Sequence, residues 1–210
     1  MVTRYQELRS ELGRLRRHLL PAKFSPTGSY NDRILDRARA YRVLAHAEIE
    51  SYLEDEVRDV LQFALRRWKT TGAMNKVLMS LVVAVRFGLA DDESAELGVQ
   101  PASIPRDTEL HDFVKEAAKR AFQRIDSNNG VQERDLKKLL MLVGVRLSDL
   151  DSVWLVSMTT FGKERGQVAH LGRGGLTQQT DPEAELKRVR NDLLPELHAL
   201  AVKLRGLKVG

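Results

Sequence analysis

Helical periodicity is the sequence feature that most constrains the fold of this chain. Apolar residues recur at steps of three and four along most of its length, which is the spacing of one face of an α-helix. The longest run extends from Asn31 or Asp32, either of which can cap a helix, to about Lys69. Its apolar positions are Ile34, Ala38, Tyr41, Ala45, Ile49, Tyr52 and Val60. Because no segment shows the alternation typical of a β-strand, we predict an all-α protein built around a helical bundle.

Turn-forming residues divide this pattern into separate helices. The predicted helices cover residues 3–20, 31–69, 73–89, 107–125, 131–143, 149 to the middle 160s, and 182–205. Pro21 ends the first helix, Ser148 is the expected cap of the sixth, and Pro182 lies in the first turn of the last. A helix of almost 40 residues is unusually long, so we expect a kink or a break within the second one.

The loops and the domain limits follow from the same pattern. We predict a surface loop at residues 90–106 and a flexible, glycine-containing loop at residues 172–180. The whole chain, residues 1–210, is then a single helical domain. Its expected parts are an amino-terminal helix at 1–22, a core at 31–172 and a carboxyl-terminal helix at 181–206.

Composition excludes several classes of protein. Hydrophobic residues make up 42% and charged residues 30%, which is typical of a globular protein. We find neither an apolar run of roughly 20 residues nor a signal peptide, and therefore expect a cytoplasmic protein without a membrane anchor. The absence of cysteine rules out a disulfide, a thiolate metal site and a cysteine nucleophile. The formal net charge of +5 is compatible with nucleic-acid contact.

The densest basic cluster is residues 14–18, which read RLRRH. It lies opposite an apolar stripe formed by Leu8, Leu12, Leu15 and Leu19. We interpret the cluster as a solvated helix face, and contact with RNA is the alternative.

Arg165 and His170 are the leading candidates for catalysis. Five residues along a helix correspond to about 500° of rotation, so the two side chains lie about 140° apart on a straight helix. They can meet at one substrate if the helix ends or bends between them, for which Gly166 and Gly172 are the candidates, or if a second chain supplies its own copy. An arginine that binds phosphate oxygens and a histidine that transfers protons are sufficient for cutting RNA without a metal.

A second pair in the chain has the same spacing. Arg106 and His111 are also separated by four residues, but Arg106 begins a helix among acidic neighbours that repel phosphate. Arg165 instead follows an apolar helix and precedes a glycine-rich turn, so we favour Arg165 with His170. A surface arginine and a helix-terminal histidine without catalytic function are the alternative interpretation.

A polar row interrupts the long second helix. Arg39, Arg42, His46 and Glu50 recur at steps of three and four, and we interpret them as a solvated edge instead of a polar cluster that faces a site. If this helix packs beside residues 161–170, Glu50 can hold Arg165 in a bidentate pair. His46 and Glu50 lack a third ligand at helical spacing, so we predict a structural hydrogen bond between them and no metal site.

Three segments carry a resemblance to a known family. They are residues 24–30 (FSPTGSY), 37–55 (RARAYRVLAHAEIESYLED) and 158–172 (MTTFGKERGQVAHLG). In these segments the chain resembles the HEPN superfamily, especially its RiboL-PSP-type members. The resemblance implies a helical bundle of HEPN type with additional helices. It also implies a metal-independent endoribonuclease that needs no cofactor, in which two chains pair so that two motifs line one cleft.

The resemblance assigns roles to particular residues. Arg165 and His170 match the family's catalytic arginine and histidine, whereas Gly166 replaces a polar residue that many active members carry, and Gln167 is expected to take over its contact. Glu50 and His46 are the expected supporting residues. The implied partners are RNA, a second copy of the chain and a regulator protein or antitoxin, in a toxin–antitoxin or phage-defence setting. The alternative is a non-catalytic helical module that binds a partner protein or RNA.

Overall fold

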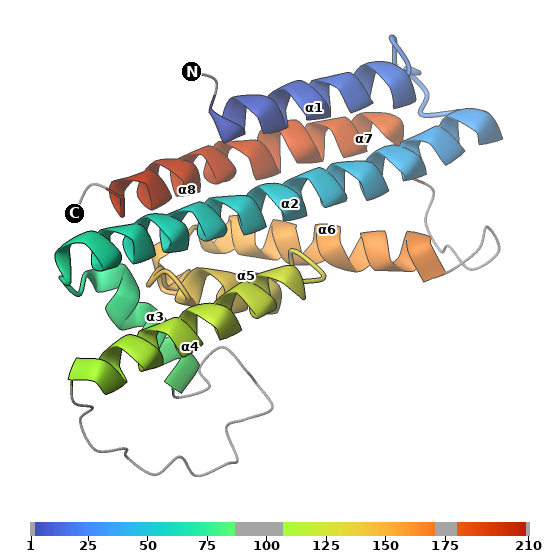
Figure 1. Ribbon diagram of the computed structural model, residues 1–210. Coiled ribbons are helices and arrows are strands. Elements are labelled where there is room, and N and C mark those ends of the chain that lie inside the picture. Colours follow the sequence, from blue (N-terminus) through green and yellow to red (C-terminus); the bar gives the residue numbers. More distant parts are fainter. Residues whose placement is uncertain (1–2, 87–106, 171–179, 209–210) are drawn as a thin grey trace. The chain divides into compact units, whose positions relative to one another are not determined.

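Helices and turns make up the described part of the chain, as the apolar periodicity predicts (Figure 1). A computed structural model describes residues 3–86, 107–170 and 180–208, with all their side chains except those of residues 86, 107–109 and 167–170. These three ranges contain no β-strand. The predicted all-α fold class is therefore confirmed.

α1 (Arg4–Leu19) begins and ends where local chemistry requires. The Thr3 side chain accepts a hydrogen bond from the backbone N–H of Gln6, and the Gln6 side chain accepts one from the N–H of Thr3 at 2.8 Å. The backbone becomes extended at Leu20, directly before Pro21, which cannot continue a helix. The helix buries Leu8, Leu12 and Leu15. The predicted first helix is confirmed.

α2 (Asp32–Thr71) is one continuous helix of 40 residues. The Asn31 side chain caps it by accepting a hydrogen bond from the N–H of Ile34 at 3.0 Å, as the sequence predicts. The break that we expected inside it is absent, because no proline or glycine interrupts the run and buried apolar positions continue along its length. Gly72, with a φ of +68°, then ends the helix in the left-handed conformation that favours glycine.

Three more predicted helices are present, namely α3 (Lys76–Arg86), α4 (Asp107–Asp126) and α5 (Glu133–Met141). α4 ends one residue later than predicted, and α3 and α5 are shorter than predicted. α3 begins later than predicted because the side chain of Asn75 caps it, accepting a hydrogen bond from the N–H of Leu78 at 2.9 Å. The loop predicted at residues 90–106 lies outside the described residues.

α6 (Ser152–His170) differs from the prediction at both ends. Ser148 is not its cap, since residues 147–149 form the short 3-10 turn η1. The cap is Asp151, whose carboxylate accepts a hydrogen bond from the N–H of Trp154 at 2.7 Å. The helix also runs beyond the middle 160s, as far as His170.

The last predicted helix is confirmed but is not uniform. α7 (Pro182–Lys187) has Asp181 as its cap, with Pro182 in the first turn as predicted. It continues through η3 (Arg188–Leu193), a π-helical segment, into α8 (Leu194–Gly206). The sequence pattern did not reveal the π-helical segment, because propensity rules do not distinguish a wider helical turn from a regular one.

Two compact units make up the described structure. The first consists of Met1–Leu53, Gly130–Glu133 and Asp151–Ala201. It contains α1, the first part of α2, α6, α7, η3 and the beginning of α8. Its largest fully buried side chains are Tyr41, Ile49, Leu53 and Phe161. Polar groups of its aromatic residues reach backbone oxygens of the last helical stretch, since Tyr5 donates to Leu194 and the indole of Trp154 to Leu193.

The second unit consists of Glu54–Asn129, Arg134–Leu150 and Val202–Gly210. Its core contains apolar side chains of α3, α4, α5 and the turn that follows α5, among them Leu78, Leu81, Ile125, Leu136, Leu139, Leu140 and Leu142. Gly144 has a φ of +78°, and a Cβ at this position would lie only 2.4 Å from Oγ of Ser80. Glycine is therefore required there for both its conformation and its size.

Candidate functional site

The helix that carries the candidate catalytic pair is continuous. α6 includes Arg165, Gly166 and His170 in one run, so the end that we considered possible at Gly166 does not occur. A glycine alone does not interrupt a helix when both neighbouring turns keep their hydrogen bonds, and it costs only about 1 kcal/mol relative to alanine. Positions 165 and 170 consequently remain about 140° apart around the helix axis. The side chains of His170 and Gln167, and the whole of Gly172, lie outside the described residues.

Arg165 is half-buried and faces α2. Its side chain is 29% exposed, and its Nη2 atom lies 4.0 Å from Oε2 of Glu50. The structure therefore brings together the two residues that we predicted to meet. The bidentate geometry that we predicted is wrong, because one contact at 4.0 Å is too long for paired hydrogen bonds. Such a loose ion pair leaves the guanidinium donors of Arg165 available to another anion.

His46 lies beneath this pair. It is 1% exposed, its Nδ1 atom lies 3.5 Å from Oε2 of Glu50, and its ring packs against Phe161 with 5.7 Å between ring centroids. The predicted structural hydrogen bond is not formed, because Nδ1 has no hydrogen-bond partner among the described residues. Burial, and next the positive charge of Arg165, lower the pKa of His46 to about 4. His46 is therefore neutral at pH 7 and leaves Arg165 and Glu50 as the charged members of the group.

The lowered pKa of His46 predicts a pH-dependent stability. An unfolded histidine, with a pKa of about 6.5, binds a proton more readily than folded His46, so protonation favours the unfolded state. The contribution of neutral His46 to the free energy of unfolding is therefore complete above about pH 6.5 and is lost as the pH falls toward 4. We expect the free energy of unfolding in urea to be about 2 kcal/mol lower at pH 5 than at pH 7.5 on account of this residue. His46→Gln removes the titration and should flatten the profile by that amount. An identical profile in both proteins would contradict the assignment.

The polar row of α2 is not a solvated edge, and that prediction is wrong. Arg42 is only 9% exposed, and the side chain of Arg39 is 17% exposed with its Nη1 atom 2.7 Å from Oδ1 of Asp36. Pairing makes this burial possible, because a buried charge is tolerated only when it is paired. Arg39 has its partner on α2 itself, whereas the partners of Arg42 lie on α6 and α7 and cannot be read from the sequence of α2.

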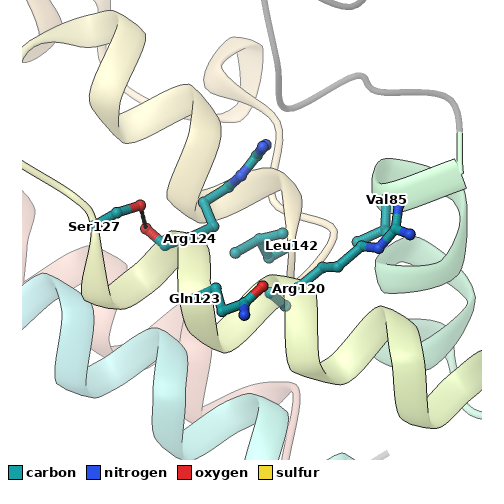
Figure 2. A pocket seen from close by; sticks show the side chains of 7 residues that line it. Val85, Arg120, Gln123, Arg124, Ser127 and Leu142 are labelled. Carbon is teal, nitrogen blue, oxygen red and sulfur yellow. Dashed lines mark hydrogen bonds between the residues drawn. The ribbon is translucent and has the colours of Figure 1, made fainter.

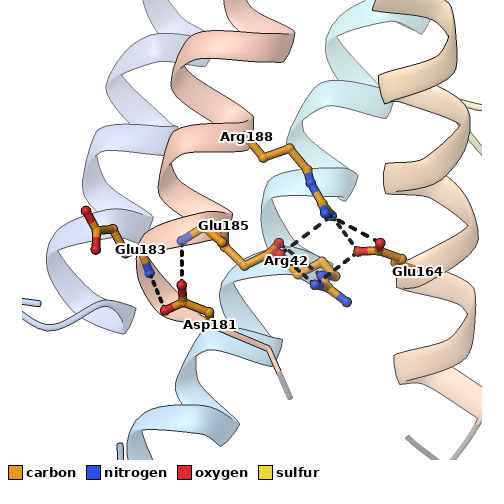
Figure 3. A network of polar contacts seen from close by, with 7 residues as sticks. Arg42, Glu164, Asp181, Glu183, Glu185 and Arg188 are labelled. Atoms are coloured by element: carbon orange, nitrogen blue, oxygen red, sulfur yellow. Dashed lines mark hydrogen bonds and ion pairs between the residues drawn. The ribbon is translucent and has the colours of Figure 1, made fainter. Parts of the chain in front are cut away.

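A buried charge cluster surrounds Arg42 (Figure 3). Arg42 donates two hydrogen bonds to Glu185 of α7, at 2.9 and 2.5 Å, and its Nη2 atom lies 3.1 Å from Glu164 of α6. Arg188 of η3 donates to Glu164 and lies 3.5 Å from Glu185. We refer to Arg42, Glu164, Glu185 and Arg188 as the charge cluster. It contains two positive and two negative groups, so it is neutral as a whole.

Sequence reasoning missed Glu164, Glu185 and Arg188. A weak signal existed, since Glu185 and Arg188 are three residues apart on a predicted helix and Glu164 precedes the candidate Arg165. These spacings are common on exposed helices and do not indicate burial. The charge cluster joins α6, α7 and η3 to α2, whereas Arg165 makes only the looser contact with Glu50.

A cavity in the second unit does not compete as a catalytic site. It has a volume of about 400 Å³ and is lined by Val85, Arg120, Arg124, Ser127 and Leu142, with Ala121 and Gln123 (Figure 2). Arg120 lies 3.0 Å from Glu116, and the Ser127 hydroxyl donates to the backbone oxygen of Arg124. No histidine, aspartate or glutamate of the described chain lines this cavity, so it offers no general base.

The rival pair is not assembled in the described structure. Arg106 lies outside the described residues, and His111 is exposed on α4 beside a largely apolar cavity that includes Trp68. His18 and His198 are exposed.

The fold and the site define the chain as an all-α protein. It has a charge cluster around the buried Arg42, and Arg165 lies part-exposed on α6. No model of a protein family, no curated protein and no solved structure matches it. No described helix is long and apolar enough to cross a membrane. Within the described ranges, no group of three or more potential ligands is arranged to hold a metal ion.

Proposed function

We propose that this chain is a metal-independent endoribonuclease of HEPN type. The observation that carries the proposal is the placement of Arg165, which is part-exposed, loosely paired with Glu50 at 4.0 Å, and located on the same helix as His170. A guanidinium held in this way retains donors for phosphate oxygens. The charge cluster ties α6 to its neighbours through Glu164, whose carboxylate is already paired with Arg42 and Arg188.

In the proposed reaction, RNA provides its own nucleophile. His170 takes the proton from a ribose 2′-hydroxyl, and the 2′-oxygen attacks the adjacent phosphorus while the bond from phosphorus to the 5′-oxygen breaks. A second His170 donates a proton to the departing 5′-oxygen, and Arg165 stabilises the charge on the phosphoryl oxygens. The products are a 2′,3′-cyclic phosphate and a 5′-hydroxyl. DNA lacks the 2′-hydroxyl and is therefore not cut.

The continuous helix favours a site formed by two chains. Because positions 165 and 170 lie about 140° apart on α6, we propose that Arg165 of one chain and His170 of its partner meet across a homodimer interface. Elsewhere on α6, Val153 and Val156 are 71% and 64% exposed and offer a partner an apolar surface to cover. Position 156 lies nine residues from position 165, about 180° around the helix axis, so this surface does not include Arg165.

Loss of cleavage on replacement of His170 tests the function. Purified protein is incubated in EDTA with a labelled single-stranded RNA and with the corresponding DNA, and the product ends are analysed. We expect the wild-type protein to cut only RNA, and His170→Ala to be about 10²–10⁴-fold slower, because general acid–base catalysis contributes that much. His18→Ala is the matched control, since it removes an exposed histidine of α1 and should leave the rate unchanged.

Three results would contradict the proposed activity. They are loss of cleavage in EDTA, cleavage of DNA, or equal rates for the wild-type protein and His170→Ala. If purified protein cut no RNA at all, the alternative of a non-catalytic helical module that binds a partner protein or RNA would be favoured. The exposed valines of α6 fit that alternative too, because a different protein can cover the same apolar surface.

We further propose that a regulator protein or antitoxin silences the nuclease in a toxin–antitoxin or phage-defence system, and that the chain acts in the cytoplasm. An enzyme that cuts cellular RNA must be held inactive in the cell that makes it. Expression of the wild-type chain is therefore expected to slow host growth, whereas expression of His170→Ala is not.

A further inference from the structure

Four arginines surround one cavity of the first unit. The cavity has a volume of about 280 Å³ and lies between α1 and the stretch formed by α7, η3 and the start of α8, which run side by side in Figure 1. Three of the arginines that line it come from α1, namely Arg9, Arg16 and Arg17, and the fourth is Arg190 of η3. We call this cavity the arginine pocket. Its described lining includes no aspartate or glutamate.

The positive charge of the arginine pocket is not compensated within the described chain. Arg9, Arg17 and Arg190 are exposed, and none of them forms an ion pair or a hydrogen bond with another described residue. Arg16 donates only to the backbone oxygens of Pro21 and Ala22, at 3.5 and 3.4 Å. Repulsion among these guanidinium groups is a cost that a bound anion would relieve.

Other arginines of the same unit show that pairing is the rule there. Arg42 and Arg188 belong to the charge cluster. Arg14 of α1 does not line the pocket, and its Nε atom lies 2.6 Å from Oε2 of Glu11. The lack of acidic partners is therefore specific to the arginine pocket and is not a general property of the arginines of this unit.

Two backbone features at the pocket point to a ligand in addition to the charge. Gly13 lines it from the middle of α1, where glycine is less favourable than alanine. A Cβ at this position would lie 3.6 Å from Nη1 of Arg17, which is one helical turn away on the same face. The missing side chain therefore leaves room beside that guanidinium group. On the opposite wall, Arg190 belongs to the π-helical segment, and short π-helical segments occur often at functional sites.

We propose that the arginine pocket binds the phosphate backbone of single-stranded RNA at a distance from the catalytic pair. This inference rests on the proposed function, because it gives the same substrate a second point of attachment. Guanidinium groups bind phosphate oxygens through two hydrogen bonds at once, and successive phosphates of one strand can engage several of them. A cavity of about 280 Å³ is small for a helix of a partner protein, whose diameter with side chains is about 10–12 Å.

Binding of an RNA that cannot be cut tests the pocket separately from cleavage. The probe is a fluorescent single-stranded 2′-O-methyl oligonucleotide, whose blocked hydroxyl cannot act as the nucleophile, and its dissociation constant is measured by anisotropy with the full-length chain. We expect Arg17→Glu and Arg190→Glu each to weaken binding by about ten-fold or more and to lower the salt dependence by about one phosphate contact. Arg14→Glu is the matched control, because it changes the net charge equally on α1 outside the pocket, and it should weaken binding by less than about two-fold.

A variant without a charge change provides a second measurement. Gly13→Leu places a side chain on the floor of the pocket and strengthens a helix position, so it should weaken RNA binding while the melting temperature stays equal or rises. Equal loss of binding in Arg14→Glu and Arg17→Glu would overturn the proposal, since it would indicate attraction by net charge alone. Absence of RNA binding by the wild-type chain, or stronger binding of an acidic peptide to the pocket, would overturn it as well.

The pocket and the catalytic proposal can fail independently. His170→Ala should lose cleavage but bind the 2′-O-methyl probe like the wild-type chain. If RNA is cut and the pocket variants bind it normally, the arginine pocket has no role in RNA binding and the nuclease proposal stands. If RNA binds through the pocket but is never cut, the nuclease proposal fails and the pocket remains an RNA-binding site.

Discussion

Replacing Glu185 by glutamine is expected to lower the free energy of unfolding by about 3–5 kcal/mol, the usual effect of removing one member of a buried ion pair. The Glu185 side chain is only 2% exposed and accepts two hydrogen bonds from Arg42. Glutamine has nearly the same shape but no charge, so the charge cluster would keep two arginines and only Glu164 to balance them. One uncompensated positive charge would then be buried. Urea unfolding followed by circular dichroism measures the change.

Glu183→Gln is the matched control for this prediction. Glu183 lies two residues earlier in α7, its side chain is 39% exposed, and it forms a surface ion pair with Lys187 at 2.8 Å. Surface pairs contribute little, so the control should cost less than about 1 kcal/mol. Equal effects of the two substitutions would show that Glu185 is not buried among charges as the structure describes. Glu185→Gln combined with Arg42→Met should recover part of the loss, because the excess charge is removed.

Mixing two inactive variants is expected to restore RNA cleavage. Arg165→Ala and His170→Ala each remove one half of the proposed site, and each should be about 10²–10⁴-fold slower than the wild-type protein. If the site combines Arg165 of one chain with His170 of the other, a heterodimer of the two variants retains one Arg165 together with one His170 and lacks only the second His170, which donates the proton to the departing oxygen. We expect the mixture, refolded together so that subunits exchange, to cut RNA at least about ten-fold faster than either variant alone.

The control for this experiment mixes Arg165→Ala with the double variant that lacks both residues. Neither chain in that mixture carries Arg165, so no heterodimer can combine Arg165 with His170, and the rate should remain at the level of the single variants. If the first mixture gained nothing although native mass spectrometry detected heterodimers, Arg165 and His170 would have to act from the same chain. That outcome would require α6 to bend in the complex with RNA.

Capping and periodicity made most of the helices predictable. Asn31, Pro21 and Pro182 each act on neighbours within about four residues, so their effects can be predicted without any tertiary contact. The errors arose where two local signals competed. Ser148 and Asp151 are both good caps, and the choice of Asp151 depended on the 3-10 turn that precedes it.

The candidate site was only partly predictable. The approach of Glu50 to Arg165 was predicted on the condition that the second helix packs beside residues 161–170, and the structure brings the two residues to 4.0 Å. The side chains of His170 and Gln167 lie outside the described residues, so their roles remain predictions. The burial of Arg42 was predicted wrongly, because hydropathy assigns an arginine to the surface unless its partner is known.

By itself, the sequence determined the helical fold class and most helix limits of this protein, because helix formation depends on residues three or four positions apart. Only the tertiary structure decided which charges are buried. Arg42 pairs with Glu185, which is 143 residues away along the chain, and no local pattern specifies such a pair. The free energy of burying a charged side chain depends on whether the fold supplies an oppositely charged partner. An arginine with such a partner can be buried, and an arginine without one remains exposed.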